Sequence, residues 1–395
     1  MTTTSSSDRR PRIALYSHDT MGLGHIRRNT LLAQVLIKPP LQANVLLISG
    51  IRESGAYPLP KGIDSITLPA YHKQPDGTYR SRSLDIDVER LIALRGAAIG
   101  AALGAFDPDL FIVDNVPRGA MKELDAPLAQ LRQGNTHTRI VLGLRDIIDT
   151  PETVARQWQK QDNFRVVHDF FDAIWIYGDT RLYDTARAYG LDRIGNKQIV
   201  NVGYLDPCER QLPVTNHDRG DAPFALCLVG GGQDGFAVAE AFAQARLPAG
   251  WRGIILSGAM MPGPKRQRLR ELTAHRQEFE VLDFVNEPIE LIREARAVVA
   301  MAGYNSTMEV LALNKRAMLV PRVTPRAEQW LRASRLAELG LVDCVHPEAL
   351  NSDTLSSWLA DERGAPPPAR RSLDFNGLNR VAEQAALLLT PQPNL

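Results

Sequence analysis

The stretch AVVAMAGYNSTMEVLALNKRAMLV, residues 297–320, joins two apolar runs through one helical pattern. Short apolar runs bounded by turn formers are typical of buried strands, and apolar positions three and four residues apart indicate a helix. We expect the first strand to end at Gly303 and Asn305 or Ser306 to cap the helix that follows. A strand, a helix and a strand in this order predict two parallel strands of one sheet with the helix packed on it.

The same alternation extends over most of the chain. The runs before residue 206 are RIALYS, NVLLIS, LFIVD, RIVLGL, AIWIY and QIVNVG, and those after residue 222 are FALCLV, GIILSG, FEVLDF, AVVAMA and AMLVP. The residues between, DPCERQLPVTNHDRGDA, have neither period and are rich in proline and charge, as expected of a linker. We therefore predict an α/β protein with two doubly wound, Rossmann-like domains whose ligand sites lie beyond the carboxyl ends of the strands.

The expected boundaries follow from these patterns. We predict a disordered polar tail over residues 1–10, an N-terminal domain over 11–205, a linker over 206–222, a C-terminal domain over 223–371, and a last helix and tail over 372–395. The pattern leaves open which domain the last helix packs on. The polar start lacks the apolar core of a signal peptide, so we expect a cytoplasmic protein.

Composition excludes several classes of partner. The chain has 46 Lys and Arg against 45 Asp and Glu, so no overall field would attract nucleic acid. Three dispersed cysteines without a C-x-x-C pair argue against a disulfide scaffold and a zinc site. The most apolar segment, residues 91–106, is shorter than a bilayer span and contains Arg95, so we expect no transmembrane segment. Peripheral contact with a membrane stays open.

The first candidate site is TMGLGHIRR, residues 20–28, where a strand gives way to a helix. Gly22 and Gly24 begin like a dinucleotide fingerprint, but Arg27 stands where the third glycine belongs, so the turn suits an anion or a substrate better than NAD. Imidazoles titrate near working pH, which makes His25 a candidate general base. The alternative is a helix-start histidine that hydrogen-bonds a neighbouring loop. Arg27 and Arg28 are expected to be solvated residues of the first turn, or to signal an anionic neighbour.

The second candidate site is VGGGQDG, residues 229–235, in which Gly230-x-Gly232-x-x-Gly235 follows a strand and opens a helix. An NAD site also needs an acidic residue about 20 positions further on, and none stands between Glu240 and Glu271. We therefore expect phosphate binding at a helix N-terminus and no nicotinamide cofactor. The alternative is a turn that serves tight packing alone.

The third candidate site begins at Gly303, where the strand that starts at Ala297 is expected to end. Free N–H groups after Gly303 would suit a diphosphate, and Glu309, about one turn inside the helix, can accept hydrogen bonds from the two vicinal hydroxyls of a ribose. Glu328 and Gln329 open the next helix at the same rim and can read sugar hydroxyls. For each residue alone, an ordinary solvated helix position is the alternative.

Four motifs together resemble a known family: GLGH, VGGGQDG, DFVNE over residues 283–287, and AGYNSTMEVLALNKRAMLVPR. They are similar to motifs of the glycosyltransferases with the GT-B fold, in the branch that contains the bacterial lipid I N-acetylglucosaminyltransferase. The resemblance implies two Rossmann-like domains facing across a cleft, with a UDP-sugar donor on the C-terminal domain. It is strong over residues 281–340 and thin over 50–200, so the family's lipid acceptor is not implied.

The resemblance also implies roles for individual residues. The donor and its nucleotide would contact Gly231, Gly232 and Gln233 at phosphate, Phe284 and Val285 at uracil, Gly303, Ser306 and Thr307 at the diphosphate, Glu309 at the ribose, and Glu328 and Gln329 at the sugar. Two positions depart from the family. Its G-G-x-G-G-H turn is reduced to TMGLGH, and the first residue of its glutamine pair is Glu328, a charge change that weakens the expectation of N-acetylglucosamine as donor sugar.

The implied activity is metal-independent, inverting transfer of a hexose-type sugar to an unidentified acceptor hydroxyl. His25 would take the proton of that hydroxyl, and Asp114, at the end of LFIVD, would hold the imidazole, with Asp19 as second choice. Arg118 and Arg145 also follow strands and are candidates for gripping the acceptor. Asp85-Ile86-Asp87 and Asp107-Pro108-Asp109 match the letters of a metal-binding D-x-D but lie away from strand ends, so no metal is expected.

Two other functions stay open at this point. A noncatalytic nucleotide-sugar sensor or partner subunit would keep Glu309 and the glycine turns but need no base. A nucleotide-sugar 2-epimerase uses carboxylates to move a proton at the sugar. That family resembles D-S-G-G-x-Q-E where this chain has MAGYNSTME, and the first acid is missing.

Overall fold

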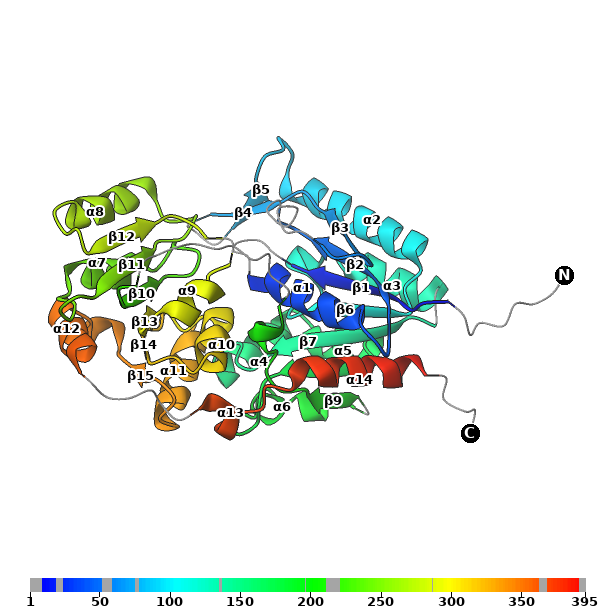
Figure 1. Ribbon diagram of the computed structural model, residues 1–395. Helices are drawn as coiled ribbons and strands as arrows, with labels where there is room; N and C mark the ends of the chain where they lie inside the picture. The colour runs from blue at the N-terminus through cyan, green and yellow to red at the C-terminus, as the bar shows by residue number, and fades with distance from the viewer. Residues whose placement is uncertain are drawn as a thin grey trace.

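The computed structural model describes residues 9–18, 24–51, 59–74, 78–134, 137–195, 197–210, 221–285, 287–361 and 368–390. Within these ranges the chain forms two parallel sheets side by side, each covered by helices on both faces (Figure 1). The prediction of two doubly wound domains is confirmed.

The N-terminal sheet has the order β3-β2-β1-β6-β7-β8-β9, with all neighbours parallel. The strands are β1 (Arg12–Ser17), β2 (Asn44–Ser49), β3 (Ile63–Thr67), β6 (Leu110–Asp114), β7 (Arg139–Arg145), β8 (Ala173–Tyr177) and β9 (Gln198–Asn201). A separate antiparallel hairpin joins β4 (Tyr71–Lys73) to β5 (Tyr79–Ser81). The helices are α1 (Gly24–Leu36), α2 (Val88–Phe106), η2 (Ala120–Lys122), α3 (Asp125–Gly134), α4 (Pro151–Lys160), α5 (Asn163–Phe170), α6 (Thr185–Ala188) and η3 (Leu191–Arg193).

The C-terminal sheet has the order β12-β11-β10-β13-β14-β15 and is also parallel throughout. Its strands are β10 (Phe224–Leu228), β11 (Arg252–Leu256), β12 (Phe279–Leu282), β13 (Ala297–Ala300), β14 (Ala317–Leu319) and β15 (Asp343–Cys344). The helices are α7 (Phe236–Gln244), α8 (Gly263–Thr273), α9 (Ile289–Glu294), α10 (Tyr304–Ala312), α11 (Glu328–Glu338), η5 (Pro347–Ala349) and α12 (Ser352–Ala360).

Alternation along the central strands divides the core into layers. In β1, Ile13 and Leu15 pack on the side of α1, whereas Ala14 and Tyr16 pack on the side of α2 and α3. Because successive strand residues point to opposite faces, a strand covered on both sides is apolar at every position. The layer under α1 continues without a break into the layer under α9, α10 and α11 of the second domain. The two domains therefore share one hydrophobic core.

The chain crosses between the domains twice. The first crossing contains η4 (Pro207–Glu209), and the second leads through α13 (Ala369–Ser372) to α14 (Gly377–Leu389). The crossings pair with each other, since Tyr204 N donates to Asp374 O at 2.7 Å. The last helix, α14, returns to the N-terminal domain and lies beside α1 (Figure 1), where Arg380 Nη1 donates to Val202 O at 2.7 Å. No helix within the described ranges is both long and apolar enough to cross a membrane.

Every run quoted above as a strand is a strand, but the start of α10 differs from expectation. The strand β13 ends at Ala300, three residues earlier than predicted, and the N-cap of α10 is Gly303, whose extended backbone has φ −64° and ψ 144°. The prediction of Asn305 or Ser306 as the cap is therefore wrong. Ser306 lies inside the first turn and donates to Gly303 O at 3.2 Å, while Asn305 reaches across to the other domain.

Candidate functional site

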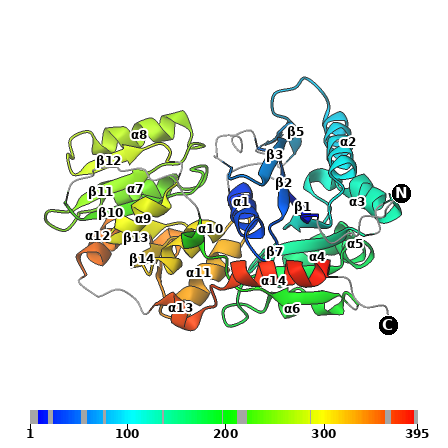
Figure 2. The same ribbon diagram turned by 45° about the vertical axis from the view of Figure 1, so that its right-hand side comes forward.

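A cavity of about 290 Å³ lies between the domains, at the carboxyl ends of the strands. In each sheet the strand order reverses at one point, between β1 and β6 and between β10 and β13, and ligands of open α/β sheets bind at such points. The helices α1 and α10 begin there and meet across the junction (Figure 2), where Asn305 Nδ2 donates to Gly24 O at 2.9 Å. Nine predicted site residues line this cavity: Gly24, His25, Arg145, Gly231, Phe284, Val285, Gly303, Ser306 and Glu309.

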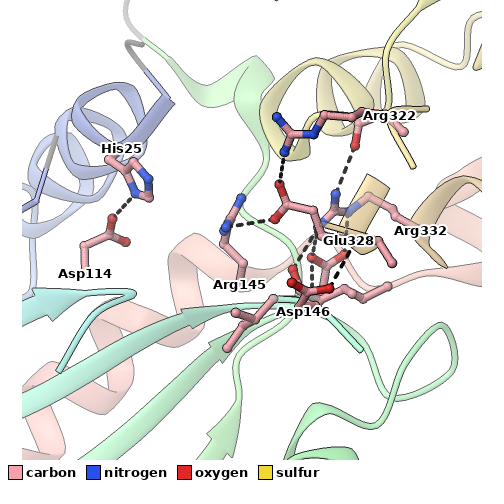
Figure 3. A network of polar contacts seen from close by, with 12 residues as sticks. His25, Asp114, Arg145, Asp146, Arg322, Glu328 and Arg332 are labelled. Atoms are coloured by element: carbon pink, nitrogen blue, oxygen red, sulfur yellow. Dashed lines mark hydrogen bonds and ion pairs between the residues drawn. The ribbon is translucent and has the colours of Figure 1, made fainter. Parts of the chain in front are cut away.

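On the N-terminal side, His25 is held by Asp114. His25 is on the first turn of α1 and Asp114 is the last residue of β6, and Nδ1 of the ring lies 2.5 Å from Oδ2 of the carboxylate (Figure 3). Because β6 lies beside β1 in the sheet, the two side chains meet although 89 positions separate them. This contact leaves Nε2 as the ring nitrogen available to a ligand.

The third member of this cluster is Arg28. Its Nε lies 2.9 Å and its Nη2 2.5 Å from Asp114 Oδ1, so the guanidinium grips the carboxylate in parallel with the imidazole. Burial opposes ionisation of Asp114, but the charges of Arg28 and His25 outweigh it and hold the pKa of Asp114 well below its usual range. Arg28 itself is 4% exposed, so the expectation of a solvated first-turn residue is wrong for it. Arg28 follows His25 by three positions and shares its helix face, which is the signal that sequence reasoning missed.

A second histidine packs against His25. His18 follows β1 directly, and its ring meets the ring of His25 edge-on with centroids 4.2 Å apart. Burial, and then the proximity of His25, hold the pKa of His18 well below its usual range, so His18 is neutral. A neutral ring in this position restricts the orientation of His25 without adding a charge to the site.

His18, His25 and Asp114 have ligand atoms within 4.8 Å of one another, close enough to raise the question of a metal. The Arg28 guanidinium, however, already lies 2.7 Å from Asp114 Oδ2 and 2.9 Å from His25 Nδ1. A divalent cation would have to displace this buried positive charge from the same atoms. The donor set therefore fits an imidazole held by an ion pair better than a metal centre.

The two D-x-D pairs act at the ends of α2. Asp87 is its N-cap and accepts from Arg90 N at 2.6 Å, and Asp107 is its C-cap. Asp109 accepts from Arg12 N at 2.7 Å at the start of β1. The Asp107 carboxylate also pairs with Arg12. These contacts account for Asp87, Asp107 and Asp109 without a metal.

On the C-terminal side, two glycine turns form a backbone surface. Gly232 follows β10 with φ 92°, and a Cβ there would collide with Ser257 O. Gly258 follows β11 with φ 83°, and a Cβ there would lie 2.5 Å from Gly230 O. Only glycine combines this left-handed backbone with so close an approach. The two turns therefore pack on each other and present Gly230, Gly231 and Gly258 to the cavity.

The start of α10 completes this side. Gly303 and Ser306 line the cavity beside the free N–H groups of the first turn, which suit an anion. Thr307 is fully buried, and its Oγ1 has no hydrogen-bond partner among the described residues. Glu309 lies deeper, with 2% of its surface exposed, and accepts from Arg210 Nη1 at 3.3 Å. Burial raises the pKa of Glu309, and Arg210 and Arg27 oppose the rise.

Glu328 and Gln329 are engaged across the domain junction. Glu328 is paired with Arg145 of the N-terminal domain at 3.0 Å and with Arg322 at 3.3 Å (Figure 3). Arg322 N donates to Gln329 Oε1 at 2.9 Å. Burial opposes ionisation of Glu328, but Arg145 and the other arginines around it lower its pKa. Neither residue lines the cavity as the structure stands, whereas Arg145, predicted to grip an acceptor, does.

Beneath this pair lies a fully buried ion pair between the domains. Arg332 of α11 donates from Nη2 to Asp146 Oδ1 at 2.7 Å and from Nε to Asp146 Oδ2 at 3.1 Å. Its Nη1 donates to Ala302 O at 3.0 Å, and Tyr204 OH donates to Asp146 Oδ2 at 3.2 Å. Both charged side chains are 0% exposed. This cluster joins the end of β7 to the C-terminal domain at the floor of the cleft.

Several predicted residues lie elsewhere. Arg118 donates to Asp125 and, at 2.6 Å, to Gln161 O, and does not line the cavity. Gly232 and Thr307 directly follow lining residues in the chain but do not line the cavity themselves, and Gln233 does not line it either. Asp19 and Gly22 fall outside the described residues.

Residues 238–383 match the family model described as the glycosyltransferase family 28 C-terminal domain. The C-terminal part of the chain matches a glycosyltransferase domain. No curated protein is similar enough in sequence to match significantly.

Solved structures match over almost the whole chain. The calicheamicin glycosyltransferase is 16% identical with a TM-score of 0.61, covering 96% of this chain and 99% of its own. MurG of Acinetobacter baumannii is 11% identical with a TM-score of 0.51 and 95% coverage of both chains. A UDP-N-acetylglucosamine 2-epimerase described as putative, from Listeria monocytogenes, is 12% identical with a TM-score of 0.61, covering 98% of this chain and 99% of its own. These likenesses show that the chain has the GT-B fold, as predicted, and that transferases and epimerases share it.

Proposed function

We propose that the protein is a glycosyltransferase that moves a hexose-type sugar from a nucleotide diphosphate sugar, UDP-linked, to a hydroxyl group of an acceptor. The observation that carries the proposal is a single cavity joining His25, held by Asp114, to the glycine turns and the start of α10. The match of residues 238–383 to a family 28 domain supports the donor class.

The C-terminal side offers a place for each part of the donor. The diphosphate is proposed to lie against Gly231 and the first turn of α10, where N–H groups and Ser306 face the cavity. The ribose hydroxyls would donate to Glu309. The base would lie against Phe284 and Val285, of which Phe284 is 47% exposed and free to cover a ring.

Transfer would proceed by one displacement. The acceptor oxygen attacks the anomeric carbon while its proton passes to Nε2 of His25, and the bond from that carbon to the diphosphate oxygen breaks with inversion. Asp114 accepts from Nδ1 and stabilises the imidazolium that forms. The leaving diphosphate gains negative charge beside the start of α10 and Arg145. We propose that no metal takes part, because Arg28 already occupies the carboxylate.

The fold neighbours make 2-epimerisation the second candidate, since two of them bear that name. An epimerase of the kind considered above uses carboxylates to take and return a proton. Among the described residues that line the cavity, Glu309 is the one carboxylate, and it is paired with Arg210. The cavity therefore favours transfer over epimerisation.

The donor site is tested by nucleotide binding. We expect UDP, and more weakly other nucleotides, to raise the melting temperature without manganese, because a ligand of the native state stabilises it by mass action. Glu309→Gln should weaken UDP binding by about tenfold or more, since hydrogen bonds to an ionised group contribute about 1.5–3 kcal/mol. Thermal unfolding with UDP, dTDP, GDP, ADP, CMP and NAD measures the first effect, and calorimetric titration with UDP measures the second.

The matched control for this experiment is Glu290→Gln, which alters an exposed carboxylate of α9 paired with Arg293. It should bind UDP like the wild type. Equal affinity of the wild type and Glu309→Gln for UDP would rule out Glu309 as the ribose-binding residue. Binding of NAD alone would rule out a UDP-sugar as the donor.

A further inference from the structure

Arg210 lies in the first crossing between the domains. Arg210 follows η4 directly, and η4 packs against α10. Its side chain is 8% exposed, although it belongs to a connecting segment. A long cationic side chain buried at such a position requires negative partners.

Those partners are two carboxylates of the proposed nucleotide site. Arg210 Nη1 lies 2.7 Å from Glu287 Oε2 and 3.3 Å from Glu309 Oε1. Glu287 follows the segment with Phe284 and Val285, and Glu309 is on α10. One guanidinium therefore contacts both the segment proposed to hold the uracil base and Glu309, the residue proposed to hold the ribose.

The charge of Arg210 favours the ionised form of the Glu309 carboxylate, against the effect of burial. Among the described residues, three charged groups act on its carboxylate: Arg210 from the crossing, Glu287 from the loop after β12, and Arg27 from α1. Burial and Glu287 both favour the protonated acid, whereas the two arginines favour the carboxylate. A protonated Glu309 would lose part of its capacity to accept hydrogen bonds from two ribose hydroxyls. Arg210 reaches Glu309 through Oε1.

We propose that Arg210 is a positioning residue for nucleotide binding: it orients the Glu309 carboxylate, and so makes the ribose site depend on the segment that joins the domains. The proposal rests on the proposed function, because it assigns Glu309 to the ribose. It adds a residue from outside the C-terminal sheet and its helices to that site.

The test compares UDP affinity at several pH values between pH 5.5 and 8.5. Arg210→Met should weaken UDP binding by about tenfold or more at pH 7, the size expected when a charge-assisted contact is lost. The pH midpoint below which UDP affinity falls should also move up, because Glu309 takes a proton at higher pH once Arg210 is gone. Titration of the UDP phosphate is common to all variants and cancels in this comparison.

Two further variants keep the test decisive if Arg210→Met folds poorly. Arg210→Lys retains the charge and should restore most of the pH profile. Glu287→Gln removes the like charge beside Glu309 and should move the midpoint down, the opposite direction. A merely structural role for Arg210 would leave the midpoints of Arg210→Met and Arg210→Lys at the value of the wild type.

The control is Arg370→Met, which removes an arginine of α13, on the second crossing, that pairs with Asp206 of the first crossing at 2.6 Å. It should leave the UDP affinity and the midpoint unchanged. If Arg210→Met matches the wild type while Glu309→Gln loses UDP, the inference is overturned and the proposed function stands. If the wild type does not bind UDP at any pH, both are overturned.

Discussion

Replacing His25 with glutamine is expected to lower the rate of sugar transfer by about 10²-fold or more, the usual contribution of a positioned general base. UDP affinity should stay close to that of the wild type, because the proposed nucleotide contacts come from the other domain. The measurement is the release of UDP from a UDP-sugar with saturating donor, with water in place of the acceptor until one is known. A loss of rate without a loss of donor affinity indicates an interaction made in the transition state.

The control for this variant is His168→Gln. His168 is an exposed residue of α5 paired with Asp169, away from the cavity, and its replacement should change neither rate nor affinity. Full activity of His25→Gln would rule out His25 as the general base. Normal UDP binding by the wild type with no turnover on any donor would favour the noncatalytic sensor.

Replacing Arg332 with methionine is expected to reduce the free energy of unfolding by about 3–5 kcal/mol, because it leaves a buried carboxylate without its partner. Asp146 and Arg332 are both 0% exposed and join the two domains, so the loss of this ion pair also weakens the contact between the domains. Chemical denaturation followed by circular dichroism measures the change. Arg332→Met combined with Asp146→Asn removes both charges and should recover part of the loss.

A matched control lies one turn further along α11. Arg335 is paired with Glu338 at the surface, with side chains 55% and 61% exposed, and Arg335→Met should change stability by less than about 0.5 kcal/mol. Similar small effects of Arg332→Met and Arg335→Met would show that the buried pair does not hold the domains together.

The strands could be predicted because they are buried on both faces and read as continuous apolar runs. The elements that were missed lack that signal. The strand β3 has the sequence IDSIT and sits at the sheet edge with most positions partly exposed, and β4 and β5 have only three residues each. Very short strands, and an edge strand as polar as β3, carry too few apolar positions for a pattern to stand out, whereas the more apolar edge strands β9 and β12 could be predicted.

The glycine turns and the start of α10 could be placed in one site because parallel strands bring their carboxyl ends to one edge. The ion pairs could not. Arg28 was expected either to be solvated or to have an anionic neighbour, and its partner, Asp114, could not be named because it lies 86 positions away. Arg210 and Glu309 meet, and Arg145 and Glu328 meet, only because one domain is docked on the other in one orientation. Local sequence patterns do not predict how the two domains are oriented relative to each other.

The most direct test of the central claim is to follow a UDP-sugar with the wild-type protein in D2O by proton NMR. We predict release of UDP and, as the first-formed sugar, the anomer of inverted configuration, with hydrogen retained at C2. Conversion of the donor into its 2-epimer, with deuterium at C2, would contradict the account and assign the protein to the epimerases that share its fold.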